Sequence, residues 1–581
     1  IYKEINLNPK VSVIIPVYNV EAYIKEMLLS VQGQSFNDFE VILVNDGSTD
    51  GSQQIIDEFC ARDERFRCFV QENAGVAAAR NLGIEKATGK YIVFYDPDDI
   101  VPVKALEKMV KAAEKNNAEM IIGVMQESDL GERKIYMNSQ KLAKKKNISP
   151  AEPRFFRAWS LCNKMFSRKF LEDNNLRMDN VFHSEDGVFT FKALNCANNI
   201  TGCDAVAYQY VKRPFWMAAS ATQKMTVKYL NELFRAHDIM IEEAEKLAHK
   251  HVEPDKRKTY LSELYMRLIS NDIINVFYRS LWKTEEGVVD SLLKRLELYK
   301  SHISDSQWKG IVKTNKDIEL EDGLMTQDEM AERPIVSVVI SPKLECKEIE
   351  YTLGGLYNQS FPRFEVLLGE KAYASPDFIY SGMANIKNYE TDGEDSWQVL
   401  GLKKSRGRYL MFLSEPLILT KNTLQSMEKK ISRKNGPDFV SVLVKKYDGQ
   451  TYSSIPEMNM IYGYSSRGRK RYNALADCDI FLSNKLIKKE ALEGIYLIGD
   501  GAEISKELYR TKKFERIRKN PMIVTASTWK KLSSKCEKPS ALRMSFNNKK
   551  NTFIDKAVEN IKRYITREDI DKVKSVLKRG K

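Results

Sequence analysis

The sequence predicts an α/β protein with mainly parallel sheets, in which one fold occurs twice along the chain. Short apolar, β-branched runs alternate with helical patterns near the N-terminus, at residues 11–15, 39–44 and 91–95. Related runs return in the same order in the second half of the chain. Strands that alternate with helices form parallel sheets whose faces the helices cover, and ligands bind beyond the carboxyl ends of such strands.

Each of the first three runs ends in residues that suit a turn or a binding site. Pro16 ends the first run, the polar segment 45–51 ends the second, and Asp96 follows the third. A short apolar run bounded in this way is typical of a buried strand. Polar and acidic residues are therefore predicted to lie at the carboxyl ends of neighbouring strands.

The middle of the chain has a different pattern. From about residue 226 to 316 glycine is scarce, and Leu261, Leu264, Tyr265 and Leu268 have the spacing of one helix face. The segment 319–332 is acidic and polar. The pattern predicts a helical connector that ends in a linker.

Four blocks of the first half match four blocks of the second half. The matched pairs are 11–15 with 336–340, 34–41 with 359–366, 89–94 with 407–412, and 162–166 with 483–487. Two copies of one fold explain this order better than chance does. We therefore divide the chain into a first domain at 1–225, a helical connector and linker at 226–332, a second copy at 333–528, and a basic helical tail at 529–581.

Composition and charge narrow the classes of partner. The chain has 581 residues, 43% of them hydrophobic, which is ordinary for a globular protein and too long for one core. Its net charge of +13 favours anionic partners, yet no nucleic-acid-binding motif accompanies it, so we expect no nucleic acid partner. No stretch approaches the ~18 consecutive apolar residues of a membrane span, and the first residues are not a secretory signal. We expect a cytoplasmic protein with at most peripheral contact to the inner face of a membrane.

The first group of residues that could bind a ligand or take part in catalysis is Asp96-Pro97-Asp98-Asp99, directly after a predicted buried strand. Carboxylates at alternate positions can converge on one hard cation, and Mg²⁺ or Mn²⁺ binds through one or two carboxylates together with substrate phosphates. The alternative is an acidic turn that leads into a helix. Taken alone, so short a motif does not decide between the two.

The second group is Glu185-Asp186, at the start of an amphipathic helical pattern. Transfer of a group to a hydroxyl needs a base that removes the acceptor proton, and a carboxylate can do this. The alternative is that two acidic residues stabilise the positive end of the helix dipole.

These groups belong to a series of five motifs in one order between residues 9 and 225. The motifs are Pro16-Val17-Tyr18-Asn19, Asn45-Asp46-Gly47-Ser48-Thr49-Asp50, the segment from Asn73 to Asn81, Asp96-Pro97-Asp98-Asp99, and Glu185-Asp186. In this the chain resembles the family-two glycosyltransferases of the GT-A fold. The resemblance implies a GT-A catalytic domain at 1–225 and a degenerate GT-A-like domain at 333–528.

The resemblance also implies a role for each motif residue. Asp46 would accept a hydrogen bond from N3–H of a uracil-like base, Asp98 would bind Mn²⁺ or Mg²⁺, and Asp186 would be the catalytic base. Arg80 would lie on the nucleotide side, although a helix-surface ion pair explains it equally well. The implied sets are Asp186 and Glu185 as catalytic residues, Asp98 and Asp96 at the metal, and Pro16, Tyr18, Asn19, Asp46, Asn73, Arg80, Asp96, Lys212 and Arg213 at the nucleotide sugar.

The implied reaction is an inverting, metal-dependent transfer from a nucleoside-diphosphate sugar, with a UDP-sugar favoured. The group transferred would be a hexosyl or N-acetylhexosaminyl unit. The acceptor would be a hydroxyl of a cell-surface glycan, a capsular polysaccharide or a polyol-phosphate polymer of the teichoic-acid type. Lys212 or Arg213 would help to neutralise the departing diphosphate. Assembly into a homo-oligomer or a larger synthase stays open.

The second copy lacks the polar residues of the first. Through the repeat, Asp98 aligns with Pro416 and Arg80 with Gln398, and no carboxylate remains at either predicted metal position. The sequence thus predicts one working site. Two alternatives remain at this point: a bifunctional polysaccharide polymerase with two working sites, and a non-catalytic glycan-binding scaffold.

Overall fold

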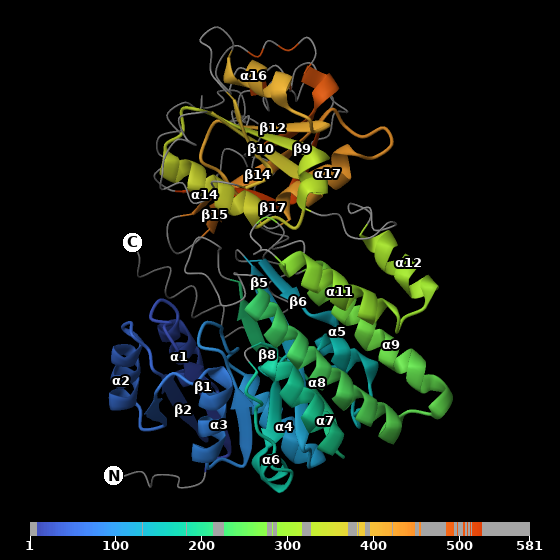
Figure 1. The fold of residues 1–581 in the computed structure, drawn as a ribbon. Coiled ribbons are helices and arrows are strands. Elements are labelled where there is room, and N and C mark those ends of the chain that lie inside the picture. The colour runs from blue at the N-terminus through green and yellow to red at the C-terminus, as the bar shows by residue number, and fades with distance from the viewer. Residues whose placement is uncertain are drawn as a thin grey trace, which may run out of the picture.

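The computed structural model shows two lobes, each built around one sheet (Figure 1). The predicted tail at 529–581 and Arg213 lie outside the described residues. The structure describes residues 9–525, apart from 130–131, 182, 213–225, 276–281, 283–286, 316–326, 370–379, 381–382, 390–395, 421, 448–451, 455–483 and short segments between 493 and 513.

The first lobe confirms the mainly parallel α/β fold. Its described strands are ordered β3-β2-β1-β4-β7-β5-β6, with β8 paired to β5. β1 to β4 are parallel, and β7 is antiparallel to both β4 and β5. The strands are β1 Val11–Val17, β2 Phe39–Asp46, β3 Phe66–Gln71, β4 Tyr91–Phe94, β5 Met120–Asp129, β6 Glu132–Ile135, β7 Lys164–Ser167 and β8 Ile200–Val211.

Helices cover this sheet, as the alternation in the sequence predicts. They are α1 Ile24–Gln32, α2 Ser52–Arg62, α3 Val76–Lys86, α4 Ala105–Asn116, α5 Met137–Ala143, α6 Arg168–Asp173 and α7 Glu185–Cys196, with a 3₁₀ turn at Pro153–Arg157. All residues of the central strand β1 are buried. α3 lies close to β1 because Gly83 has no side chain: a Cβ there would stand 2.3 Å from Cγ2 of Ile14.

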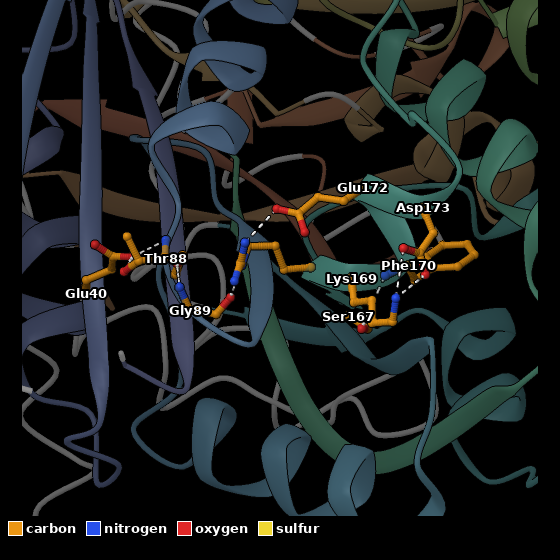
Figure 2. A network of polar contacts seen from close by, with 10 residues as sticks. Glu40, Thr88, Gly89, Ser167, Lys169, Phe170, Glu172 and Asp173 are labelled. Atoms are coloured by element: carbon orange, nitrogen blue, oxygen red, sulfur yellow. Dashed lines mark hydrogen bonds and ion pairs between the residues drawn. The ribbon is translucent and has the colours of Figure 1, made fainter. Parts of the chain in front are cut away.

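A buried carboxylate, that of Glu40, joins β1, β2 and the segment before β4 by hydrogen bonds. It lies at the amino ends of these strands, whereas the motifs lie at their carboxyl ends. Glu40 accepts hydrogen bonds from the Ser12 hydroxyl at 2.7 Å and from the Thr88 backbone N–H at 2.8 Å. Gly89 N–H donates to the Ser12 hydroxyl at 2.9 Å, and its carbonyl accepts from Arg168 Nε at 2.8 Å. Figure 2 shows this network from close by, with Glu40, Thr88 and Gly89 labelled. Its hydrogen bonds outweigh burial, so the pKa of Glu40 is lowered.

The segment predicted as a connector is helical where the structure describes it. Figure 1 shows its long helices beside the first lobe. No helix of the described residues is long and apolar enough to cross a membrane. The elements are α8 Val227–His251, a 3₁₀ turn at Pro254–Lys256, α9 Arg257–Arg267, a π-helix at Leu268–Ile274, α11 Val288–Lys300, α12 Asp305–Thr314 and α13 Gln327–Glu332.

The second lobe repeats the strand order of the first. Its described strands run β11-β10-β9-β12-β16-β14-β17-β13, with β15 on β14. β16 is antiparallel to β12 and β14, as β7 is to β4 and β5, and β17 is parallel to β14, as β8 is to β5. The elements are β9 Val336–Ile340, α14 Cys346–Tyr357, β10 Phe364–Gly369, β11 Ile386–Tyr389, α16 Trp397–Lys404, β12 Tyr409–Leu413, β13 Ile418–Leu419, α17 Thr423–Ile431, β14 Phe439–Tyr447, β15 Tyr452–Ser454, β16 Lys485–Lys488, a 3₁₀ turn at Lys489–Leu492 and β17 Phe514–Thr525.

The buried carboxylate network recurs in this lobe. Glu365 accepts from the Ser337 hydroxyl at 2.6 Å and from Arg406 N–H at 2.7 Å, while Gly407 N–H donates to the Ser337 hydroxyl at 2.8 Å. A Cβ at Gly401 of α16 would stand 2.3 Å from Cγ1 of Val339. The positions that set the fold of the first lobe therefore have counterparts in the second.

Candidate active site

The predicted site residues gather at one edge of the first sheet. β1, β2 and β4 are parallel, so their carboxyl ends meet there. Tyr18 follows β1, Asp46 is the last residue of β2, and Asp96 comes shortly after β4. Glu185 is the first residue of α7. It lies at the same edge, because Arg80 forms ion pairs with both Glu185 and Asp96.

Arg80 of α3 joins the two acidic groups of the sequence. Its Nη1 donates to Oε1 of Glu185 at 2.6 Å, and its Nη2 donates to Oδ1 of Asp96 at 2.7 Å. Its side chain is buried, so the ion pair is internal and the helix-surface interpretation is wrong. Burial lowers the pKa of Arg80, but the two carboxylates more than offset this and raise it. The guanidinium stays charged and holds both acidic groups in one site.

Asp96 is held on both of its oxygens. Oδ1 accepts from Arg80, while Oδ2 accepts from Cys162 Sγ at 3.3 Å and from the Tyr208 hydroxyl at 3.4 Å. Tyr208 is itself fixed, since its ring stacks on Tyr95 with the ring centroids 5.8 Å apart. The carboxylate of Asp96 therefore has a set orientation before any substrate binds.

Asp99 is a third carboxylate of this turn, to which the sequence analysis gave no role. It is only 2% exposed; Oδ1 accepts from Val211 N–H at 2.6 Å, and Oδ2 accepts from the Tyr208 hydroxyl. Burial, followed by the charges of Asp98 and Asp96, raises its pKa well above the usual range. The acidic sequence hinted at Asp99, but its contacts with β8 could not be predicted from spacing.

The acidic turn has the chemistry of a cation site. Asp96, Asp98 and Asp99 crowd negative charge together, and a divalent ion would relieve this repulsion. Asp98 is partly exposed. Among the described residues no three or more His, Cys, Asp or Glu side chains form a metal cluster by themselves. A metal here would therefore complete its ligands from substrate oxygens and water, as Mg²⁺ usually does.

Asp186 has the properties of a general base. It lies in the first turn of α7, and Gly187 N–H donates to its Oδ1 at 2.7 Å. Burial and the neighbouring charge of Glu185 raise the pKa of Asp186 to about 7. A base with a pKa near the working pH is the most effective kind. Arg80 anchors Glu185, so the adjacent Asp186 is positioned indirectly by the same ion pair.

A buried lysine interacts electrostatically with Asp186. Lys164 of β7 is fully buried and donates from Nζ to the carbonyl of Ala158 at 2.8 Å. Burial lowers its pKa to about 7, against the pull of Asp186. Lys485 is buried at the equivalent place in the second lobe and contacts Asn484 as Lys164 contacts Asn163.

Asp46, which the sequence predicts at the nucleotide, accepts hydrogen bonds from three protein donors. Gln71 Nε2 donates to it at 2.6 Å, and the N–H groups of Ala74 and Gly75 donate at 2.9 Å each. Gly75, with φ of 90°, precedes α3. Asp46 thereby holds the loop that leads to Arg80, a structural task that the sequence did not reveal.

The other residues that the sequence predicts at the nucleotide lie at or near the same edge of the sheet. Pro16 is buried at the end of β1, while Tyr18 is 50% exposed and Asn73 is exposed. Asn19 accepts from Thr49 N–H at 2.8 Å and so joins the loops that follow β1 and β2. The loops that follow β1 and β2 thus lie at the sheet edge that also carries the acidic turn.

Lys212 has a carboxylate partner in the structure. Its Nζ donates to Oε1 of Glu127 at 2.7 Å, beyond the end of β8. It thus forms an ion pair with a residue of β5 that the sequence analysis did not single out.

Comparisons with known proteins match the first part of the chain to glycosyltransferases. Residues 12–174 match the family model for Glycosyl transferase family 2. The chain is 34% identical over 216 residues to the uncharacterized glycosyltransferase EpsJ of Bacillus subtilis. This alignment covers 36% of this chain and 62% of that protein. It is 31% identical over 241 residues to the putative glycosyltransferase EpsH of the same organism. This second alignment covers 39% of this chain and 66% of that protein.

The chain thus spans less than two thirds of the length of these relatives. Among solved structures, Staphylococcus aureus TarS 1-349 in complex with UDP aligns with 20% identity and a TM-score of 0.39, over 53% of this chain and 91% of that one. The family match and the two relatives all concern the first domain. Residues 12–174 are thus similar to glycosyl transferase family 2.

Proposed function

We propose that the first domain transfers a sugar from a nucleoside-diphosphate donor to a hydroxyl acceptor, with inversion at the anomeric carbon. One observation carries the proposal: Arg80 binds Asp96 and Glu185 at once, so the donor side and the base side form a single site. The names of the relatives, both glycosyltransferases, support the reaction class.

In the proposed reaction, the carboxylate of Asp186 removes the proton of the acceptor hydroxyl as the new bond to the sugar forms. Arg80 holds Glu185 and Asp96 in place. Its side chain and that of Glu185 are largely shielded from water, whereas the side chain of Asp96 is 37% exposed and can face a substrate. We assign Asp98 to Mn²⁺ or Mg²⁺ because it belongs to the acidic turn and is partly exposed, whereas Asp99 is buried. A bound divalent ion would supply charge neutralisation at the diphosphate of the donor.

We favour a UDP-sugar carrying a hexosyl or N-acetylhexosaminyl group. Asp46 ends β2, and the exposed Tyr18 follows β1, the strand paired with β2, which suits recognition of a base and ribose at this edge. For the acceptor we propose a cell-surface glycan or a polyol-phosphate polymer. The reaction would take place in the cytoplasm or at the inner face of the membrane.

We further propose that residues 333–528 are a degenerate copy of the same domain. The strand order and the buried network of Glu365 support this. Gln398 is buried where Arg80 would be, and Ser414 and Pro416 stand where Asp96 and Asp98 would be. Without these charges the second lobe would contribute packing, acceptor binding or assembly. The same losses disfavour a polymerase with two working sites.

A screen of donor hydrolysis tests the proposal. The full chain would be incubated with UDP-, GDP-, CDP- and dTDP-sugars in the presence of Mn²⁺ or Mg²⁺, and the released sugar measured. We expect hydrolysis of at least one donor, and a loss of about 100-fold or more in Asp98→Ala, because charge stabilisation by the metal contributes several kcal/mol. Asp173→Ala, in an exposed pair with Lys169, is the matched control and should behave as wild type. Failure to hydrolyse or bind any donor would contradict the proposal.

A further inference from the structure

A strip of side chains runs outward from the acidic turn along one face of β5 and β8. The two strands are parallel, with Glu127 opposite Tyr210. Residues two apart on a strand share a face, so Tyr208 and Tyr210 point to the same side. Because the Tyr208 hydroxyl reaches Asp99, the face that carries Tyr210 is the face of the acidic turn.

The outer end of the strip is a polar cluster between two aromatic rings. Glu127 is buried, and its Oε2 accepts from the Tyr136 hydroxyl at 2.6 Å while its Oε1 accepts from Lys212 Nζ at 2.7 Å. Tyr136 and Tyr210 each keep 37% of their surface exposed. The carboxylate and the ammonium group therefore hold their positions between rings that solvent can reach.

Backbone contacts fix the strip against the acidic turn. Ile100 and Gln209 exchange N–H to carbonyl hydrogen bonds of 3.1 and 3.0 Å, and Val211 N–H donates to Asp99. Tyr210 lies between these two attachment points.

The order of the strands places the strip on the acceptor side of the proposed site, away from the nucleotide of the donor. The residues proposed for the nucleotide follow β1 and β2, and the acidic turn follows β4. β5 and β8 lie on the other side of β4 in the sheet, beyond β7. A donor bound across β1, β2 and β4 would therefore direct its sugar toward the strip, where the acceptor must approach.

We propose that Tyr136, Tyr210, Glu127 and Lys212 form the acceptor subsite and bind a pyranose ring of the acceptor glycan. The inference rests on the proposed function. Aromatic side chains present apolar faces that suit the C–H faces of a sugar, and a few fixed polar groups suit its hydroxyls. Lys212 is thereby assigned to the acceptor and not to the departing diphosphate.

Saturation-transfer NMR on the full chain tests the proposal with three probes: the p-nitrophenyl glycosides of glucose, galactose and N-acetylglucosamine. Wild type should bind at least one of them. Tyr210→Ala and Lys212→Met should each weaken that binding about tenfold, whereas Tyr210→Phe, which keeps the ring, should stay near wild type. Tyr351→Ala removes an exposed ring on α14 of the second lobe and is the matched control.

Nucleotide binding, measured on the same variants by titration with UDP and Mn²⁺, separates the two proposals. We expect Tyr210→Ala to keep the UDP affinity of wild type, and Tyr18→Ala to lose UDP affinity but keep glycoside binding. Unchanged glycoside binding in both Tyr210→Ala and Lys212→Met would overturn the acceptor subsite, as would a wild-type chain that binds none of the three probes. A wild type that binds glycosides but no nucleotide would count against the proposed function instead.

Discussion

Replacing Asp186 by Asn is expected to lower kcat for sugar transfer by about 10²–10⁴-fold, because the amide cannot accept the proton of the acceptor hydroxyl. The affinity for the nucleotide donor should stay the same, since Asp186 lies on the base side of Arg80. Steady-state transfer with the donor found in the hydrolysis screen gives kcat, and titration with the nucleotide gives the affinity. Asn has the size of Asp, so the local fold should be kept. A variant with wild-type kcat would exclude Asp186 as the base.

The pH dependence of the wild-type enzyme follows from the same residue. The pKa of Asp186 is raised to about 7, so the carboxyl is increasingly protonated as the pH falls through 7 and can then no longer take a proton. We expect kcat to fall on the acid side of this value and to level off above it. Residual turnover by Asp186→Asn should lack this step. A wild-type profile that is flat through pH 7 would contradict the assignment.

Replacing Arg80 by Met should have the largest effect on stability. The change leaves Glu185, with a side chain 13% exposed, and Asp96 without their shared cation. Removing one partner of a buried ion pair costs about 3–5 kcal/mol, because the remaining charge stays desolvated. Urea unfolding of the full chain, followed through the transition of the first lobe, measures the loss.

Two further variants make that measurement specific. Lys169→Met breaks an exposed ion pair with Asp173 on α6, and such pairs contribute about 0–1 kcal/mol. Arg80→Lys keeps the charge but cannot donate to both carboxylates through a planar fork, so it should fall between wild type and Arg80→Met. If Arg80→Met were as stable as Lys169→Met, the ion pair would not hold the site together.

The parts of the fold that sequence could predict are those set by local pattern. Continuous apolar runs identified β1, β2 and β4, and the repeat anticipated the equivalent order of strands in the second lobe. β3 was not singled out, because its residues are mostly half-buried or exposed and its pattern is correspondingly weak. Edge strands such as this one are specified by their neighbour more than by their own sequence.

The parts of the site that sequence could not predict depend on contacts between distant segments. Arg80 was identified, but whether it lay on the surface or inside depended on how α3 and α7 meet. The bond between Tyr208 and Asp99 joins β8 to the turn after β4, and no spacing rule relates these residues. The same holds for Glu127 and Lys212, which are brought together by the register of β5 and β8.

The most direct test of a single nucleotide-sugar site in the first domain is a calorimetric titration of the full chain with UDP in the presence of Mn²⁺. The account predicts one UDP bound per chain, with affinity greatly reduced by EDTA or by Asp98→Ala. No binding of UDP, with none of GDP, CDP or dTDP in its place, would contradict the assignment of the site. Two equivalents per chain, one of them retained in Asp98→Ala, would show that the second lobe is not degenerate.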